Sequence, residues 1–151
     1  MAAEETLQDA GELAVRWRSL VTAWAGEGRA SDDGESVVVE FDLPGPPGEP
    51  GTLSLRFMRT SHLLVVFMTD GRPLPPGRLA RAAATANAWN TEQLVPMLSV
   101  WDVHGPHPVL AGVCSLPLGL RMGPREFAVV AADWAERGAA MFVRCRQVVD
   151  Q

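Results

Sequence analysis

The spacing of apolar positions along the chain predicts three helices. Residues 7–24 repeat an apolar side chain every three or four positions, from Leu7 to Trp24, which gives the segment one apolar face. The alanine-rich run 78–90 has a high helix propensity, and we expect its helix to begin near Pro76 or Gly77. A third helix should run from Pro124 to about Val149. Its apolar stripe comprises Phe127, Val130, Trp134, Met141, Phe142, Cys145 and Val149.

Five strands are predicted between these helices, from β-branched residues and from alternation of apolar and polar positions. They are 36–43, 52–59, 62–69, 94–103 and 108–118. The strand at 62–69 is apolar on both faces, which favours a central position or coverage on both sides. The segment 44–51, "PGPPGEPG", can neither pair in a sheet nor form a helix, and it predicts a long hairpin loop rather than a proline-rich docking motif.

The resulting order is α-β-β-β-α-β-β-α. Because the strands follow one another in groups instead of alternating with helices, the sequence predicts an α+β fold with an antiparallel sheet of about five strands. We expect one domain over residues 1–151, with residues 1–8 as a disordered tail.

Charge and composition exclude several classes of function. The chain has 151 residues and a formal net charge of −5, and its 13 cationic residues are all arginines, which is typical of a GC-rich bacterial gene. No dense basic patch is present to bind a nucleic-acid backbone. No apolar run approaches the roughly 18 residues of a membrane span. The acidic N-terminus lacks the features of a signal peptide, so we expect a cytoplasmic protein with Cys114 and Cys145 reduced and buried.

No group of residues predicts catalysis or a cofactor. His104 and His107 flank "GP" close to Asp102 and could attract a divalent metal. A structural zinc site needs four ligands, however, and no second cluster supplies the others. We therefore expect an exposed turn at this position, no bound metal and no cofactor.

The motif "NAWN", with Asn87, Trp89 and Asn90, ends the middle helix of the prediction. Asparagine can adopt the left-handed conformation that terminates a helix, and its amide can satisfy backbone groups of a neighbouring segment. We expect Asn90 to stop the helix and Asn87 to tie it to a neighbouring strand or loop. Both residues would then act on stability, and a ligand-contact role is the alternative.

The last predicted helix would be about 39 Å long at ~1.5 Å per residue. Such a helix could extend beyond the sheet, which would expose Met141 and Phe142 late on its apolar stripe together with Trp134. These three residues form the candidate interface, and a homodimer through the sheet or this helix is the expected assembly.

The chain resembles the YbjN family of bacterial proteins in the order of its elements over about residues 10–149, and in its motifs over residues 85–142. The similarity rests on the N-x-W-N motif, on "PMLSVWD" and "PVLAGVCSLPL", and on "GPREF" before the long helix. Members are described as candidate regulators of sensory transduction and share the fold of type III secretion chaperones. The resemblance implies a chaperone-like adaptor or regulator that binds a protein partner, without enzymatic activity and without catalytic residues to carry over. The loop 44–51 and "HGPHP" depart from the family pattern.

A second class of function stays open. Tryptophan-lined clefts bind small molecules, and a cleft near Trp89, Trp101 and His104 would make the chain a small-molecule-binding protein or an enzyme of a type that the motifs do not reveal.

Overall fold

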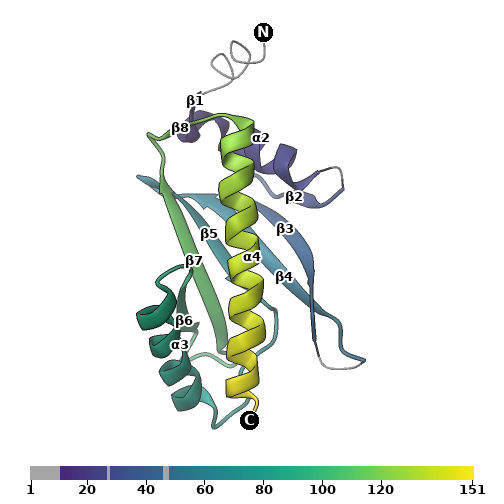
Figure 1. Ribbon diagram of the computed structural model, residues 1–151, viewed down its shortest axis with the longest axis vertical. Coiled ribbons are helices and arrows are strands. Elements are labelled where there is room, and N and C mark those ends of the chain that lie inside the picture. Colours follow the sequence, from purple (N-terminus) through teal and green to yellow (C-terminus); the bar gives the residue numbers. More distant parts are fainter. Residues whose placement is uncertain (1–10, 27, 46–47) are drawn as a thin grey trace.

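An antiparallel sheet and three helices are formed by the residues that the computed structural model describes, 11–26, 28–45 and 48–151 (Figure 1). The helices are α2 (Leu13–Ala25), α3 (Leu79–Gln93) and α4 (Pro124–Val149). The main sheet has the order β2-β3-β4-β5-β7-β6, and every pair in it is antiparallel. Its strands are β2 (Ala30–Asp32), β3 (Ser36–Leu43), β4 (Gly51–Arg59), β5 (Leu63–Thr69), β6 (Met97–Trp101) and β7 (Val109–Pro117).

The predicted fold class is confirmed, and the structure adds elements at its margins. The five expected strands are present, and β2 extends the sheet as a sixth strand. The first helix begins at Leu13 instead of Leu7, because residues of β1 (Gly11–Glu12) pair with β8 (Arg121–Met122). The predicted tail at 1–8 lies outside the described residues. None of the helices in the described chain is long and apolar enough to cross a membrane.

All three helices lie on one face of the sheet. In Figure 1, α4 runs lengthwise in front of the strands, and α2 and α3 pack against it near its two ends. Alternate residues of each strand point toward the helices and form the core. They include Val37, Val39, Leu53, Leu55, Phe57, Leu64, Val66, Met68, Leu98, Leu110 and Cys114.

Helix α4 packs on the sheet through buried residues from Phe127 to Val149. At Gly138 the approach is close, because a Cβ atom there would lie 2.6 Å from the Met68 sulfur. The glycine therefore allows close contact with β5 in the middle of a helix that continues from Pro124 to Val149. Burial persists to the final turn, where Val149 is completely inaccessible to solvent.

The prediction that the candidate interface on α4 is exposed is therefore wrong. Met141 and Phe142 are 0% exposed and Trp134 is 6% exposed, all within the core of the chain itself. The helix does not extend past the sheet, because the ends of β3, β4 and β5 and the packed α3 still lie beside its last turns. A dimer through these three side chains would require the core to open.

Helix α3 continues past Asn90 to Gln93, so the expectation that Asn90 ends it is wrong. The left-handed residue at its end is Leu94, with φ 67° and an exposed side chain. The side-chain amide of Asn90 instead points toward β6 and bonds to it.

Candidate functional site

The sheet face opposite the helices carries an apolar surface, which we call the outer face. It is formed by the strand residues that alternate with the core positions, and no helix of the described chain covers it. The strand register arranges these residues in rows across the sheet. The apolar members of the outer face are Val38, Met58, Leu63, Val65, Phe67, Met97, Trp101, Val109, Ala111 and Val113.

Two aromatic rings form the centre of the outer face. Phe67 of β5 and Trp101 of β6 meet edge to face with their ring centroids 4.8 Å apart. The strand between them is β7, where Ala111 lies midway between Val113, the partner of Phe67, and Val109, the partner of Trp101. The small side chain of Ala111 leaves room for both rings to lean over it, which explains why this alanine is buried.

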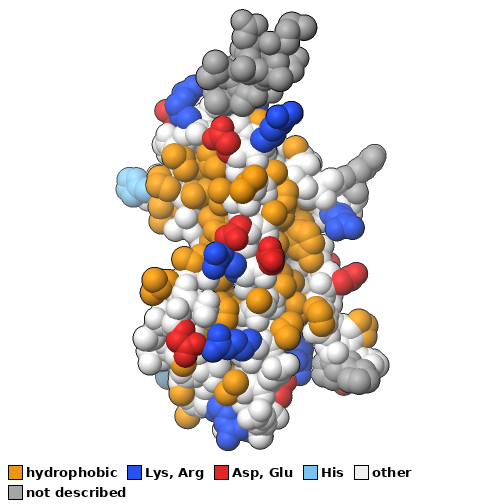
Figure 2. Space-filling view, viewed as in Figure 1, with side chains coloured by type: hydrophobic (Ala, Val, Ile, Leu, Met, Phe, Trp, Pro, Cys, Tyr) orange, Lys and Arg blue, Asp and Glu red, His pale blue; other side chains and the backbone are white. Residues whose placement is uncertain are grey.

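The outer face exposes large apolar side chains at its β6 margin. Met97 is 61% exposed and Trp101 is 42% exposed. On the helix side, viewed in Figure 2, hydrophobic side chains also reach the surface, but charged side chains interrupt them along α4, including the pair Asp133–Arg137. Isolated apolar residues such as Val129 are normal at a protein surface, whereas a continuous apolar area marks a contact site.

The charges of the outer face lie on β3 and β4. Glu40 and Asp42 point to this face on β3, and both are exposed. Arg56 of β4 is held within the chain, because its guanidinium donates to the Ser36 hydroxyl at 2.7 Å and lies 3.5 Å from an Asp33 carboxylate oxygen. The free charge of this face is therefore negative.

Asn90 and Trp89 attach helix α3 to the free edge of β6. The Asn90 amide nitrogen donates to the Leu98 carbonyl at 2.8 Å, and its amide oxygen accepts the Leu98 N–H at 2.7 Å. Trp89 donates its indole N–H to the Pro96 carbonyl at 2.9 Å. The asparagine thus bonds to β6 as a neighbouring strand would, which protects this sheet edge.

The structure does not bring Asn87, Trp89 and Trp101 together in one site. Asn87 is exposed, and its side-chain amide forms no hydrogen bond with the described residues; its backbone carbonyl accepts a hydrogen bond from the Thr91 hydroxyl. Trp89 belongs to the core on the helix side, whereas Trp101 lies on the outer face. The expected cleft between Trp89, Trp101 and His104 therefore does not form, because β6 separates the two indoles.

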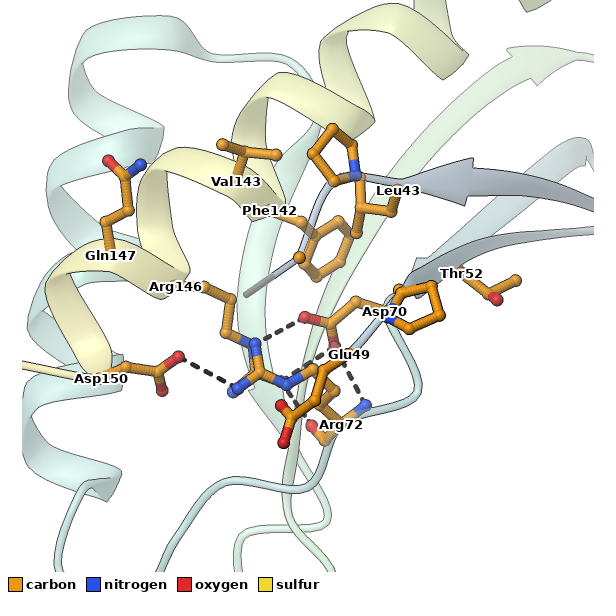
Figure 3. Close-up of a pocket in the computed structure, with 14 residues that line it drawn as sticks. Leu43, Glu49, Thr52, Asp70, Arg72, Phe142, Val143, Arg146, Gln147 and Asp150 are labelled. Carbon is orange, nitrogen blue, oxygen red and sulfur yellow. Dashed lines mark hydrogen bonds and ion pairs between the residues drawn. The ribbon is translucent and has the colours of Figure 1, made fainter. Parts of the chain in front are cut away.

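A pocket of about 600 Å³ lies between the last turns of α4 and the ends of β3 and β4 (Figure 3). Arg146 points from α4 into its wall and makes two hydrogen bonds to the Asp70 carboxylate, at 2.6 and 2.9 Å, and one to the Arg72 carbonyl. Arg72 in turn pairs with Asp150 at 3.2 Å. Two ion pairs thus neutralise four of the charges in this wall, and they fasten the end of α4 to the segment after β5.

The two cysteines and the two histidines His104 and His107 do not line this pocket. Both cysteines are free and buried, as predicted. Burial raises the pKa of Cys114 to about 12, with a further increase from Asp133, and burial raises the pKa of Cys145 to about 11. Both thiols are therefore protonated near neutral pH and are poor nucleophiles. No group of three or more metal-binding side chains is found in the described part of the chain, and His104 and His107 are exposed.

One signal of the outer face is present in the sequence. The apolar residues on both faces of β5 predict a central position or coverage on both sides, and the structure shows the central position. The contact between Phe67 and Trp101 depends on the order β5-β7-β6, which the sequence alone does not determine.

A comparison with solved structures finds a protein of similar fold. The fold is similar to that of E. coli YbjN, described as "a putative transcription regulator", with a TM-score of 0.66 over 91% of this chain and 96% of that chain. The two sequences are 14% identical, so the similarity concerns the fold. No family model and no curated protein matches the sequence. The chain thus shares the fold of YbjN, as the resemblance of its motifs implied.

Proposed function

We propose that the protein is a non-enzymatic protein-binding module, an adaptor or regulator that contacts its partner through the outer face. The observation that carries this proposal is the apolar surface around Phe67 and Trp101, which the described helices leave uncovered. An exposed apolar area of this kind is costly in water unless a partner covers it for part of the time.

Charge supports a protein partner over a nucleic acid. The chain has a formal net charge of −5, and the exposed charged residues Glu40 and Asp42 on the outer face would repel a phosphate backbone. The E. coli protein with a similar fold is described as "a putative transcription regulator". A regulatory role for this chain would therefore act through contact with another protein.

The chemistry of the described residues favours binding over catalysis. Both thiols are protonated at neutral pH, and the charged residues Asp70, Arg72, Arg146 and Asp150 are engaged with one another. These groups lack the activated nucleophile or poised acid and base that an active site requires.

Affinity purification from the native host tests this proposal. The tagged wild type should recover the same protein partner repeatedly, and the Met97→Ser/Trp101→Ser variant should lose it. The matched control is Val15→Ser/Val129→Ser, which removes two exposed apolar side chains from helices α2 and α4. Loss of the partner from the control alone, or no specific partner with any form, would contradict the proposal.

A small-molecule role is the second candidate, and the pocket beside Arg146 favours it. Its volume of about 600 Å³ falls within the range of roughly 300–1,000 Å³ typical of ligand sites. A thermal-shift screen with a metabolite library tests this candidate. A ligand that raises the melting temperature of the wild type but not that of a Val143→Trp variant, in which the pocket is filled, would support it.

A further inference from the structure

We infer that the outer face binds an amphipathic helix with a basic flank. This inference rests on the proposed function and adds the chemistry of the partner. The apolar area lies on β5, β7 and β6, and the exposed carboxylates Glu40 and Asp42 lie on β3. The two parts of the outer face therefore call for an apolar stripe and a positive flank on the same segment.

The spacing of the strands suits one helix. Neighbouring strands are about 4.8 Å apart, so β3 lies roughly 10 Å from β5 and 14 Å from β7. A helix with its side chains is about 10–12 Å wide. When its apolar stripe covers Phe67 and Trp101, lysine or arginine side chains on its flank reach over β4 to Glu40 and Asp42.

The charges favour a basic partner over a second copy of this chain. Glu40 and Asp42 form no ion pair with another described residue. The cation of the same face, Arg56, already bonds to Ser36 and Asp33. If two outer faces met, each would bring exposed carboxylates, and Arg56 would have to leave Ser36 and Asp33 to neutralise them.

The sheet edges favour a helix over an added strand. Strand addition needs free N–H and C=O groups along an edge. At β6, Asn90 already occupies both outward groups of Leu98, and the opposite edge strand, β2, has only three residues. An extended segment lying flat on the outer face would leave its own backbone groups without partners, whereas a helix satisfies most of them internally.

Synthetic peptides test the inference directly. The probe is a labelled peptide of about 18 residues, roughly 27 Å long as a helix, with leucines along one stripe and lysines on the flanks. Its matched counterpart carries glutamate in place of lysine. Fluorescence anisotropy should show binding of the lysine peptide to the wild type, weakening as salt increases, and no binding of the glutamate peptide.

Two pairs of variants locate the binding site. Glu40→Gln/Asp42→Asn should weaken the lysine peptide by about two- to thirtyfold, the combined effect of two exposed ion pairs. Glu126→Gln/Glu136→Gln removes the same charge from exposed positions of α4 and should leave the Kd unchanged. Met97→Ser, which alters one exposed side chain, should weaken the binding of the lysine peptide, and the double variant Met97→Ser/Trp101→Ser should weaken it further. Circular dichroism confirms that each variant is folded.

Several results would overturn the inference. Equal weakening by the α4 control would mean a general attraction of cations to an acidic protein, and equal binding of the glutamate peptide would mean that charge has no role. A doubling of the 16.3 kDa mass in light scattering that is abolished by Met97→Ser, without peptide binding, would show a second copy as the occupant. If the peptides fail while affinity purification still recovers a partner through the outer face, the proposed function stands and this inference alone is wrong.

Discussion

The two faces of the sheet are both apolar at their centre, but helices cover only one of them. On the helix side, Leu55, Phe57 and Val66 are completely buried beneath α2 and α4. On the outer face, Phe67 and Trp101 contact each other and remain partly open to solvent. Burial beneath a helix contributes to the stability of the fold, whereas the exposed apolar area contributes little to it and is available to a partner.

Truncation of the buried α4 stripe should have the largest effect on stability. Phe142→Ala removes a completely buried ring and should lower the free energy of unfolding by about 3–5 kcal/mol. For a chain of this size, that corresponds to a fall in melting temperature of roughly 6–20 °C. Differential scanning calorimetry measures it. A small change in stability together with dissociation of a dimer would restore Phe142 as an interface residue.

The ion pair that fastens the end of α4 should have an effect of similar or slightly smaller size. Asp70 and Arg146 are 1% and 7% exposed in their side chains, so Asp70→Asn leaves a buried cation without its counter-charge. The expected cost is about 3–5 kcal/mol in urea unfolding. The double variant Asp70→Asn/Arg146→Met should recover part of this loss because it removes the unpaired charge. A double variant less stable than Asp70→Asn would refute that reason.

The two asparagines of the motif should differ, in contrast to the expectation from the sequence that both act on stability. Asn90→Ala leaves the Leu98 N–H and carbonyl without their partners and should cost about 1–3 kcal/mol. Asn87→Ala alters an exposed side chain and should stay within about 0.5 kcal/mol. Thermal unfolding of both variants checks the contrast. Equal losses would mean that the Asn87 amide supports the fold.

Changes on the outer face should affect stability less than binding. Trp101→Ser removes one edge-to-face aromatic contact, worth about 0.5–1.5 kcal/mol. Urea unfolding should therefore show a modest change, far below that of Phe142→Ala. A loss of about 3 kcal/mol or more, the value for truncation of a buried aromatic ring, would mean that the outer face is a second core.

The smallest predicted effect is the stability that Asp33, in the loop that holds Arg56, loses in acid. The backbone N–H groups of Ser36 and Glu35 donate to Asp33 and lower its pKa from 3.8 to about 2. A pKa that is lower in the folded state contributes stability above about pH 4 that is lost as pH falls toward 2. Because this carboxylate is exposed, the contribution should be small. Urea midpoints at pH 5 and pH 2.5 should differ less for Asp33→Asn than for the wild type, and equal differences would contradict this assignment.

Local patterns predicted the elements well because each pattern is complete within its own segment. The stripe from Phe127 to Val149 and the proline at position 124 sufficed for α4, and the strand 36–43 was predicted with the bounds that the structure shows. What covers a stripe depends on the rest of the chain. The sequence therefore identified Met141 and Phe142 as apolar positions but did not reveal that the sheet and α3 bury them.

The candidate site was less accessible to sequence reasoning because its contacts join distant segments. Asp70 and Arg146 are 76 positions apart, and Phe67 reaches Trp101 only because β7 lies between their strands. The tie to a neighbouring strand was expected of Asn87, but Asn90 makes it, because the packing of α3 beside β6 directs the Asn90 amide to Leu98.

Site-specific photo-crosslinking in the native host tests most directly whether the outer face is the binding surface. A photoreactive amino acid is placed singly at Met97 or Trp101 on the outer face, and at Val15 or Val129 on the helices as controls, since all four side chains are exposed. We predict that Met97 and Trp101 give covalent adducts with the same protein, and that the two helix positions give none with it. Adducts formed at Val15 or Val129 but not at Met97 or Trp101 would contradict the assignment and place the binding surface on the helix side.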